Sequence, residues 1–170
     1  MTTDSLHDII ADRARALRLV FEDEVAEAIV RLSAGYPHFT HLLALKSAEN
    51  AIRTGRRRIE RSDLPLAMST AVEDAEGSLR TTYNASVRAQ TEVYRKVLTT
   101  AASLDDLEFT ISQLRHKFPK DFDPTGPLRK LVSNDGSTIL RRAAKGAYRF
   151  SDPRMRSYIR IIHLMVDPIT

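Results

Sequence analysis

The chain has 170 residues, of which 42% are hydrophobic and 28% charged, and its formal net charge is +4. A chain of this length can bury a stable core without a metal or a disulfide, and the lack of cysteine excludes thiol nucleophiles and cysteine-based zinc sites. No apolar run approaches the roughly 20 residues of a membrane span, and the first residues lack the basic character of a signal peptide, so we expect a cytoplasmic protein without a membrane partner.

The N-terminal part predicts a bundle of four helices. Apolar residues recur at helical spacing in the segments 6–17, 25–32, 39–52 and 64–72. Asp4 or Ser5 is the expected N-cap of the first helix, and Ser62 with Asp63 is the expected cap of the fourth. Three acidic residues, Glu22, Asp23 and Glu24, lie in the first turn of the second helix, where negative charge stabilises a helix.

A tight corner joins the second and third of these helices. Gly35 can adopt the left-handed conformation that ends a helix, and Pro37 fits the first turn of the next one. His38 and His41 follow, where the third helix exposes the amide N–H groups that attract anions such as phosphate. Two other interpretations stay open: the corner serves only capping and packing, or the two histidines bind a metal, for which the sequence offers no third ligand.

Arginines follow the third helix, at Arg56, Arg57, Arg58 and Arg61. A group of arginines in a loop either contacts nucleic acid or forms a solvated surface or a contact to a neighbouring element. Beyond the fourth helix, helical spacing continues from Leu79 to about residue 102. We expect one long helix here, or two helices with a break near the glycine at position 77.

The C-terminal part changes to short helices and strands. A short extended segment, 109–110, leads into a helix that Pro119 ends, and a second helix covers 124–132. The segment 133–137 is a turn signal, after which strands 138–142 and 147–150 flank a loop with Gly146. A last helix begins at Asp152. This order is typical of a winged helix-turn-helix.

The positive charge of the chain lies in this C-terminal part, where from Phe109 onward twelve Lys and Arg face five Asp and Glu. The expected contacts to duplex DNA are six cations: Arg129, Lys130, Arg141, Arg142, Lys145 and Arg149. The first two lie on the second short helix, which enters the major groove in helix-turn-helix proteins, and the others line the hairpin. About four to six phosphate contacts predict a log–log salt slope of about −4 to −5. A solubilising surface of mixed charge is the other interpretation.

Several segments together resemble a known family. They are Gly35-Tyr-Pro-His-Phe with Leu42-Leu-Ala-Leu, then Ala51-Ile-Arg-Thr-Gly, and downstream Tyr148-Arg-Phe-Ser-Asp-Pro-Arg-Met-Arg-Ser-Tyr158. In these the chain resembles the region after the nucleotide-binding core of AAA+ and STAND-type ATPases, which include origin-recognition-like and transposition ATPases. The resemblance implies a mainly α fold with a helical lid-like bundle over 1–77, a connecting helix over 78–103 and a winged-helix domain over 104–170.

The nucleotide-binding core itself has no counterpart in the sequence. There is no Gly-x-x-x-x-Gly-Lys-Ser/Thr loop and no apolar strand ending in paired acidic residues. We therefore expect no catalytic residue, no metal site and no cofactor of the chain's own. The resemblance implies that Gly35, Pro37, His38 and His41 approach ATP and magnesium only when a missing core domain is supplied.

The expected partners are an ATPase core domain or a partner ATPase, together with duplex DNA, and a homo-oligomer is left open. The competing interpretation is a protein-interaction or oligomerisation module that does not bind DNA. Its support is the last helix, which carries apolar residues on more than one face: Tyr158, Ile161, Ile162, Leu164 and Met165.

Overall fold

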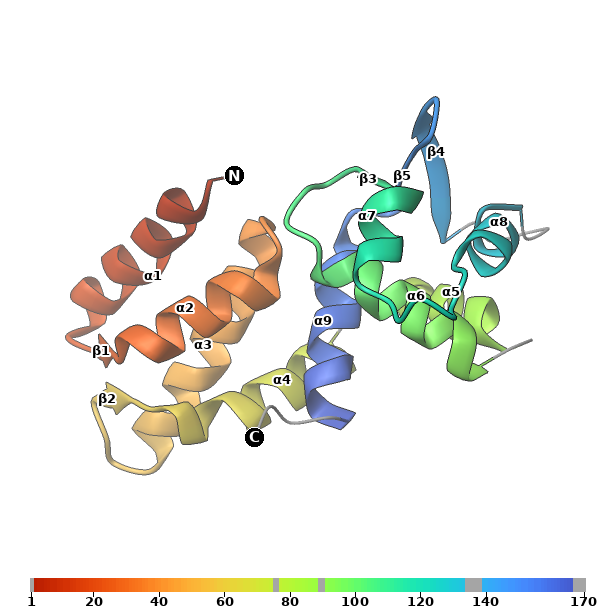
Figure 1. Cartoon of the computed structure of the whole chain (residues 1–170). Coiled ribbons are helices and arrows are strands. Elements are labelled where there is room, and N and C mark those ends of the chain that lie inside the picture. Colours follow the sequence, from red (N-terminus) through yellow and green to blue (C-terminus); the bar gives the residue numbers. More distant parts are fainter. Residues whose placement is uncertain (1, 75–76, 89–90, 134–138, 167–170) are drawn as a thin grey trace. The chain divides into compact units, whose positions relative to one another are not determined.

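The computed structural model describes residues 2–74, 77–88, 91–133 and 139–166 (Figure 1). These residues are mainly helical and carry a small antiparallel sheet, which confirms the fold class at that level. By its contacts the chain divides into two compact units. Unit 1 is the chain up to Ala75 together with the segment from Ile161, and unit 2 is Glu76–Arg160.

Unit 1 contains the four expected helices: α1 (Thr3–Leu17), α2 (Asp23–Ser33), α3 (Pro37–Arg53) and α4 (Leu64–Glu73). Helix α3 contacts each of the other three and so forms the centre of the bundle. Its Leu43 is fully buried, as are Val25 and Ile29 of α2. The periodic apolar residues that predicted the helices thus form the core.

The N-cap of α1 differs from the prediction. Because the helix already begins at Thr3, neither Asp4 nor Ser5 can precede it. The cap is Thr2, whose hydroxyl oxygen accepts a hydrogen bond from the backbone N–H of Ser5 at 3.3 Å.

Two short parallel strands, which the sequence did not predict, complete unit 1. They are β1 (Val20–Phe21) and β2 (Arg58–Ile59). The backbone N–H of Val20 donates to the carbonyl of Arg57 at 2.9 Å, and that of Glu22 donates to Ile59 at 3.1 Å. Strands of two residues are too short to show alternation, so no pattern signals them. They fix the arginine-rich loop after α3.

Unit 2 begins with α5 (Gly77–Val87) and α6 (Thr91–Ser103). The prediction of a continuous helix between Leu79 and residue 102 is therefore wrong. The spacing could not reveal this break, because Val87 and Tyr94 are seven residues apart and would also lie on one face of an unbroken helix.

The rest of unit 2 continues with β3 (Phe109–Thr110), α7 (Ile111–His116), α8 (Thr125–Ser133), β4 (Leu140–Ala144) and β5 (Ala147–Phe150). The strands form an antiparallel sheet in the order β3-β5-β4. The expected hairpin is confirmed, but its first strand runs to Ala144 rather than ending at residue 142, so the loop consists of Lys145 and Gly146 alone. Gly146 has the positive φ of +78° that favours glycine. The predicted turn at 133–137 and the strand start at position 138 lie outside the described residues, apart from residue 133, which ends α8.

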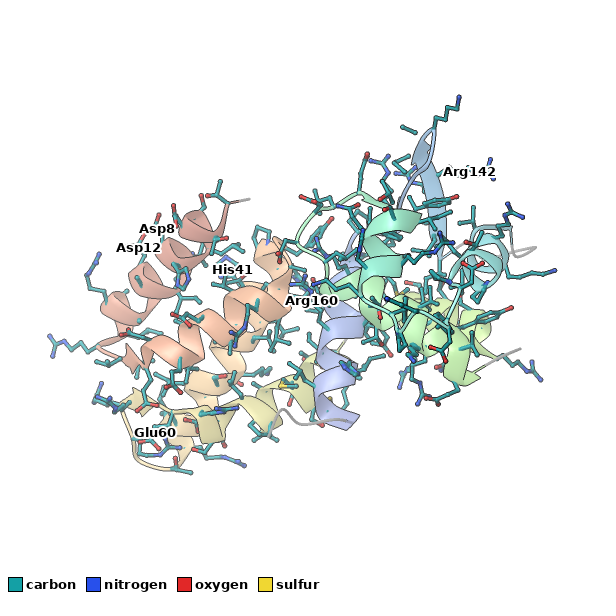
Figure 2. All side chains as sticks on the ribbon, viewed as in Figure 1. Asp8, Asp12, His41, Glu60, Arg142 and Arg160 are labelled. Carbon is teal, nitrogen blue, oxygen red and sulfur yellow. The ribbon has the colours of Figure 1, made fainter. Side chains whose placement is uncertain are left out.

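Helix α9 (Arg154–Val166) starts in unit 2, where two arginines hold it to the end of α6. Arg156 Nε donates to the carbonyl of Ala102 at 3.2 Å, and Arg160 Nε donates to the same oxygen at 2.6 Å (Figure 2). Arg160 Nη2 also donates to Leu104 O at 2.9 Å. These bonds satisfy carbonyls that a helix C-terminus leaves open. Burial, together with the charge of Arg156, lowers the pKa of Arg160 to about 10.

Candidate nucleic-acid interface

The register of the β4–β5 hairpin assigns its cations to two different faces. Arg141 lies opposite Arg149, whereas Arg142 lies opposite Tyr148. Because neighbouring residues of a strand point to opposite faces, Arg141 and Arg149 share one face and Arg142 lies on the other. The sequence predicts that all of these cations line the hairpin but does not distinguish its two faces.

The face that carries Arg142 is otherwise the buried face of the sheet. Leu140 and Phe150 form the next pair on it, at 0% and 5% exposure, and Phe109 of β3 is 1% exposed. The Phe109 ring stacks on that of Tyr148, with 6.2 Å between centroids. Arg142 is exposed and lies two residues further along β4 than the buried Leu140, on an edge strand of the described sheet that also contacts α8 (Figure 2).

Helix α8 presents two of the predicted cations to solvent. Leu128 and Leu131 anchor it in the core with 0% and 1% exposure, whereas Arg129 and Lys130, between them in sequence, are exposed. The segment before α8 is fixed by Asp123. Its Oδ1 accepts from the backbone N–H of Thr125 at 3.1 Å and from the Thr125 hydroxyl at 2.7 Å.

Asp123 also ties this turn to the preceding helix α7. Arg115 Nη2 donates to Asp123 Oδ1 at 2.8 Å. The hydrogen bonds from Arg115 and Thr125 lower the pKa of Asp123 to about 2, so the carboxylate stays charged at neutral pH. These bonds therefore hold the first residue of α8 to helix α7.

The opposite face of the hairpin already contains a carboxylate of the chain itself. Arg149 Nη1 lies 3.6 Å from Glu108 Oε1, and both side chains are about half exposed. Arg141 faces Arg149 directly across the strands, a like-charge pair that is unfavourable in isolation. Lys145, in the loop of the hairpin, is exposed.

In unit 1 the corner between α2 and α3 has the predicted conformation, with one addition. Gly35 has a φ of +88° and Pro37 is the first residue of α3, as expected. The C-cap of α2 is Ala34, which is also left-handed at a φ of +49°. His38 and His41 are both exposed. Within the described residues no group of three or more metal-ligating side chains exists, and the nucleotide contact stays a prediction.

Asp63, which follows the arginine-rich loop, differs in its side-chain contacts from the prediction. Asp63 holds the N-cap position of α4, as expected, but its side chain makes no capping hydrogen bond to that helix. Instead its carboxylate, at 0% exposure, accepts from Arg56 Nη2 at 2.7 Å, from Asn50 Nδ2 at 2.7 Å and from the backbone N–H of Glu60 at 2.9 Å. Arg56 is therefore an internal contact rather than a nucleic-acid contact.

The other arginines of this loop remain on the surface. Arg58 Nε donates to Glu22 Oε1 at 3.0 Å, next to the parallel strand pair. Arg57 and Arg61 are exposed. This loop thus combines structural and solvated arginines, and composition alone does not distinguish them.

A shallow pocket of about 320 Å³ in unit 2 was not predicted from the sequence. Among the described residues that line it, Asp152 is the one carboxylate, and Arg154 Nη2 donates to its Oδ2 at 2.8 Å. The pocket therefore offers mainly hydroxyl groups and apolar side chains. Its lining residues are Ser78, Leu79, Thr82, Ile139, Ser151, Asp152 and Met155.

Comparisons of the chain with protein-family models, with curated proteins and with solved structures find no match. Among the helices that the structure describes, none has both the length and the apolar character needed to cross a membrane.

Proposed function

We propose that unit 2 is a winged-helix module that binds duplex DNA weakly, and that unit 1 is a lid-like helical bundle. Together they form the non-catalytic C-terminal part of an AAA+ or STAND-type ATPase machine. The nucleotide-binding core, with its ATP and magnesium, is supplied by a domain or partner outside this chain. The chain itself hydrolyses no ATP, because its sequence has no phosphate-binding loop.

The observation that carries the proposal is the order of elements in unit 2. Helix α6, strand β3, helices α7 and α8 and the β4–β5 hairpin follow one another, and the sheet order is β3-β5-β4. In a helix-turn-helix the second helix of the turn, here α8, enters the major groove. Figure 1 shows the hairpin projecting beside this helix, as a wing requires.

The charges and the side-chain types favour binding to the DNA backbone over reading of its bases. Arg129 and Lys130 on α8, with Arg142 and Lys145 on the hairpin, are exposed cations that can meet phosphates. Helix α8 has nine residues and includes neither Asn nor Gln, the side chains that pair with adenine. Binding should therefore be weak and led by shape.

The lid assignment of unit 1 has separate support. The corner around Gly35 and Pro37 begins α3, and His38 and His41 in its first turns are exposed. Such a helix start suits a position beside a nucleotide that another domain holds. The family resemblance stated above adds to this assignment.

A titration of a fluorescein-labelled duplex with the full chain tests the proposal. We expect a rise in fluorescence anisotropy at about 50 mM NaCl, and an affinity at least about 100-fold weaker at about 200 mM NaCl, because each phosphate contact releases counterions. A duplex of unrelated sequence serves as the matched control and should bind about equally well. Absence of binding at the lower salt concentration would refute DNA binding.

One observation favours the alternative of a protein-interaction or oligomerisation module. Leu45 and Ile52 are 51% and 55% exposed and lie seven residues apart, on one outward face of α3. Tyr158 and Ile161 of α9, by contrast, are buried in the chain itself. Light scattering separates the two functions: a mass above 19.2 kDa that falls in the variant Leu45→Glu favours the alternative.

A further inference from the structure

We propose that only one face of the β4–β5 hairpin meets the duplex, and that Arg142 is its phosphate contact, whereas Arg141 and Arg149 take no part. This inference rests on the proposed DNA binding by unit 2. It goes beyond that function because it assigns the contact to one of two adjacent arginines that the sequence treats as equivalent.

The first step is the direction of the side chains. Arg142 belongs to the face on which Leu140, Tyr148 and Phe150 are buried, so it shares the side of the sheet that the helical core covers. Arg141 points to the other side. Helix α8 contacts β4, and its buried Leu128 belongs to the same core. A duplex that holds α8 in its groove therefore passes the Arg142 side of the hairpin.

The second step is the exposure of Arg142 on an otherwise apolar face. Its cross-strand neighbour Tyr148 is 7% exposed, whereas Arg142 lies on an edge strand of the described sheet and is solvent-exposed. In the part of the chain that the structure describes, Arg142 has no ion pair with a carboxylate. Its charge is thus available to an external anion, on a strand that contacts α8.

The third step is the different charge environment of the opposite face. Arg149 lies 3.6 Å from the carboxylate of Glu108, which partly neutralises it and would repel a phosphate. Arg141 stands directly across from Arg149 and shares this environment. A phosphate approaching Arg141 would meet the Glu108 carboxylate nearby, whereas among the described residues no carboxylate forms an ion pair with Arg142.

Two charge reversals in the full chain form a matched test. Arg142→Glu and Arg141→Glu alter adjacent exposed residues of one strand and change the net charge equally, so unspecific electrostatic effects cancel in the comparison. We expect Arg142→Glu to weaken duplex binding about tenfold and to reduce the salt slope by about 1, and Arg141→Glu to weaken it less than about threefold with the slope unchanged.

Equal losses in the two variants, or a larger loss for Arg141→Glu, would overturn the assignment while leaving DNA binding intact. A wild-type chain that does not bind duplex at low salt refutes the proposed function itself, and the assignment with it. Circular dichroism melts confirm that both variants fold. If a reversal prevents folding, the milder pair Arg142→Gln and Arg141→Gln decides by the same comparison.

Discussion

Arg56 forms a bidentate pair with the buried carboxylate of Asp63: Nη2 donates to Oδ1 at 2.7 Å and Nη1 donates to Oδ2 at 3.0 Å. Asn50 of α3 donates to the same carboxylate, which lies directly before α4. The pair therefore connects the end of α3 to the start of α4. This contact determines which of the loop arginines matters for stability.

Replacement of Arg56 should destabilise the fold, and replacement of its neighbour should not. We expect Arg56→Ala to lower the free energy of unfolding by about 2 kcal/mol, since it leaves a buried carboxylate without its cation. Arg57→Ala removes an exposed side chain and should change stability by less than about 0.5 kcal/mol. Urea denaturation monitored by circular dichroism measures both. Similar losses in the two variants would contradict the role given to Arg56.

The same carboxylate predicts a specific pH dependence. Burial disfavours the charged form of Asp63, but hydrogen bonds from Arg56, Glu60 N–H and Asn50 outweigh it and hold the pKa below its usual range. A lowered pKa in the folded state stabilises the protein above the unfolded-state pKa of about 3.9, and this stability is lost as the pH falls through the folded-state pKa.

We therefore expect wild-type stability to fall more steeply below about pH 4 than that of Asp63→Asn, which cannot titrate at this position. Urea midpoints measured from pH 5 downward give the comparison, with Asp4→Asn, a change at an exposed residue, as the control. Parallel curves for wild type and Asp63→Asn would show that Asp63 contributes no such stability.

Alanine substitutions at two glycines, Gly35 at the α2–α3 corner and Gly126 in α8, should affect stability differently. Gly35→Ala should destabilise unit 1 by about 1 kcal/mol, because a Cβ is strained at a φ of +88°. Gly126→Ala in α8 should be neutral or stabilise by up to about 1 kcal/mol, because no heavy atom lies within 4 Å of the added Cβ. Thermal melts report both changes. A Gly35→Ala chain as stable as wild type would exclude strain at the corner.

Two cations of unit 2 should show separable roles. Arg160→Ala should lower stability by about 1 kcal/mol, because the Leu104 carbonyl loses the donor Arg160 Nη2 and the Ala102 carbonyl keeps only the longer hydrogen bond from Arg156. Lys145→Ala changes an exposed hairpin residue and should weaken duplex binding with stability unchanged. Melting curves and anisotropy titrations on both variants test this separation. The reverse pattern would contradict the assignment of Lys145 to the interface.

Helical spacing and turn residues were enough to predict the four helices of unit 1 and the hairpin of unit 2. They failed where the structure depends on contacts distant in sequence. The β1–β2 pair joins Val20 to Arg58 over only two residues per strand, and the break between α5 and α6 leaves Val87 and Tyr94 in helical phase.

The candidate site was predictable by residue type but not by direction. Composition identified the basic hairpin, but the side of the sheet on which each arginine lies follows from the register, in which Arg141 pairs with Arg149 and Arg142 with Tyr148. A shift of register by one residue would exchange the two faces. Likewise, only packing reveals that Arg56 is an internal residue bound to Asp63.

The central claim is that α8 and the β4–β5 hairpin form a DNA-binding surface, and amide chemical shifts of the ¹⁵N-labelled chain test it most directly. On addition of a duplex at low salt, we expect the shifts to move in α8 and around Arg142 and Lys145, and to return when salt is raised. Shifts confined to α1–α4 of unit 1, or no change at a saturating duplex concentration, would contradict the account.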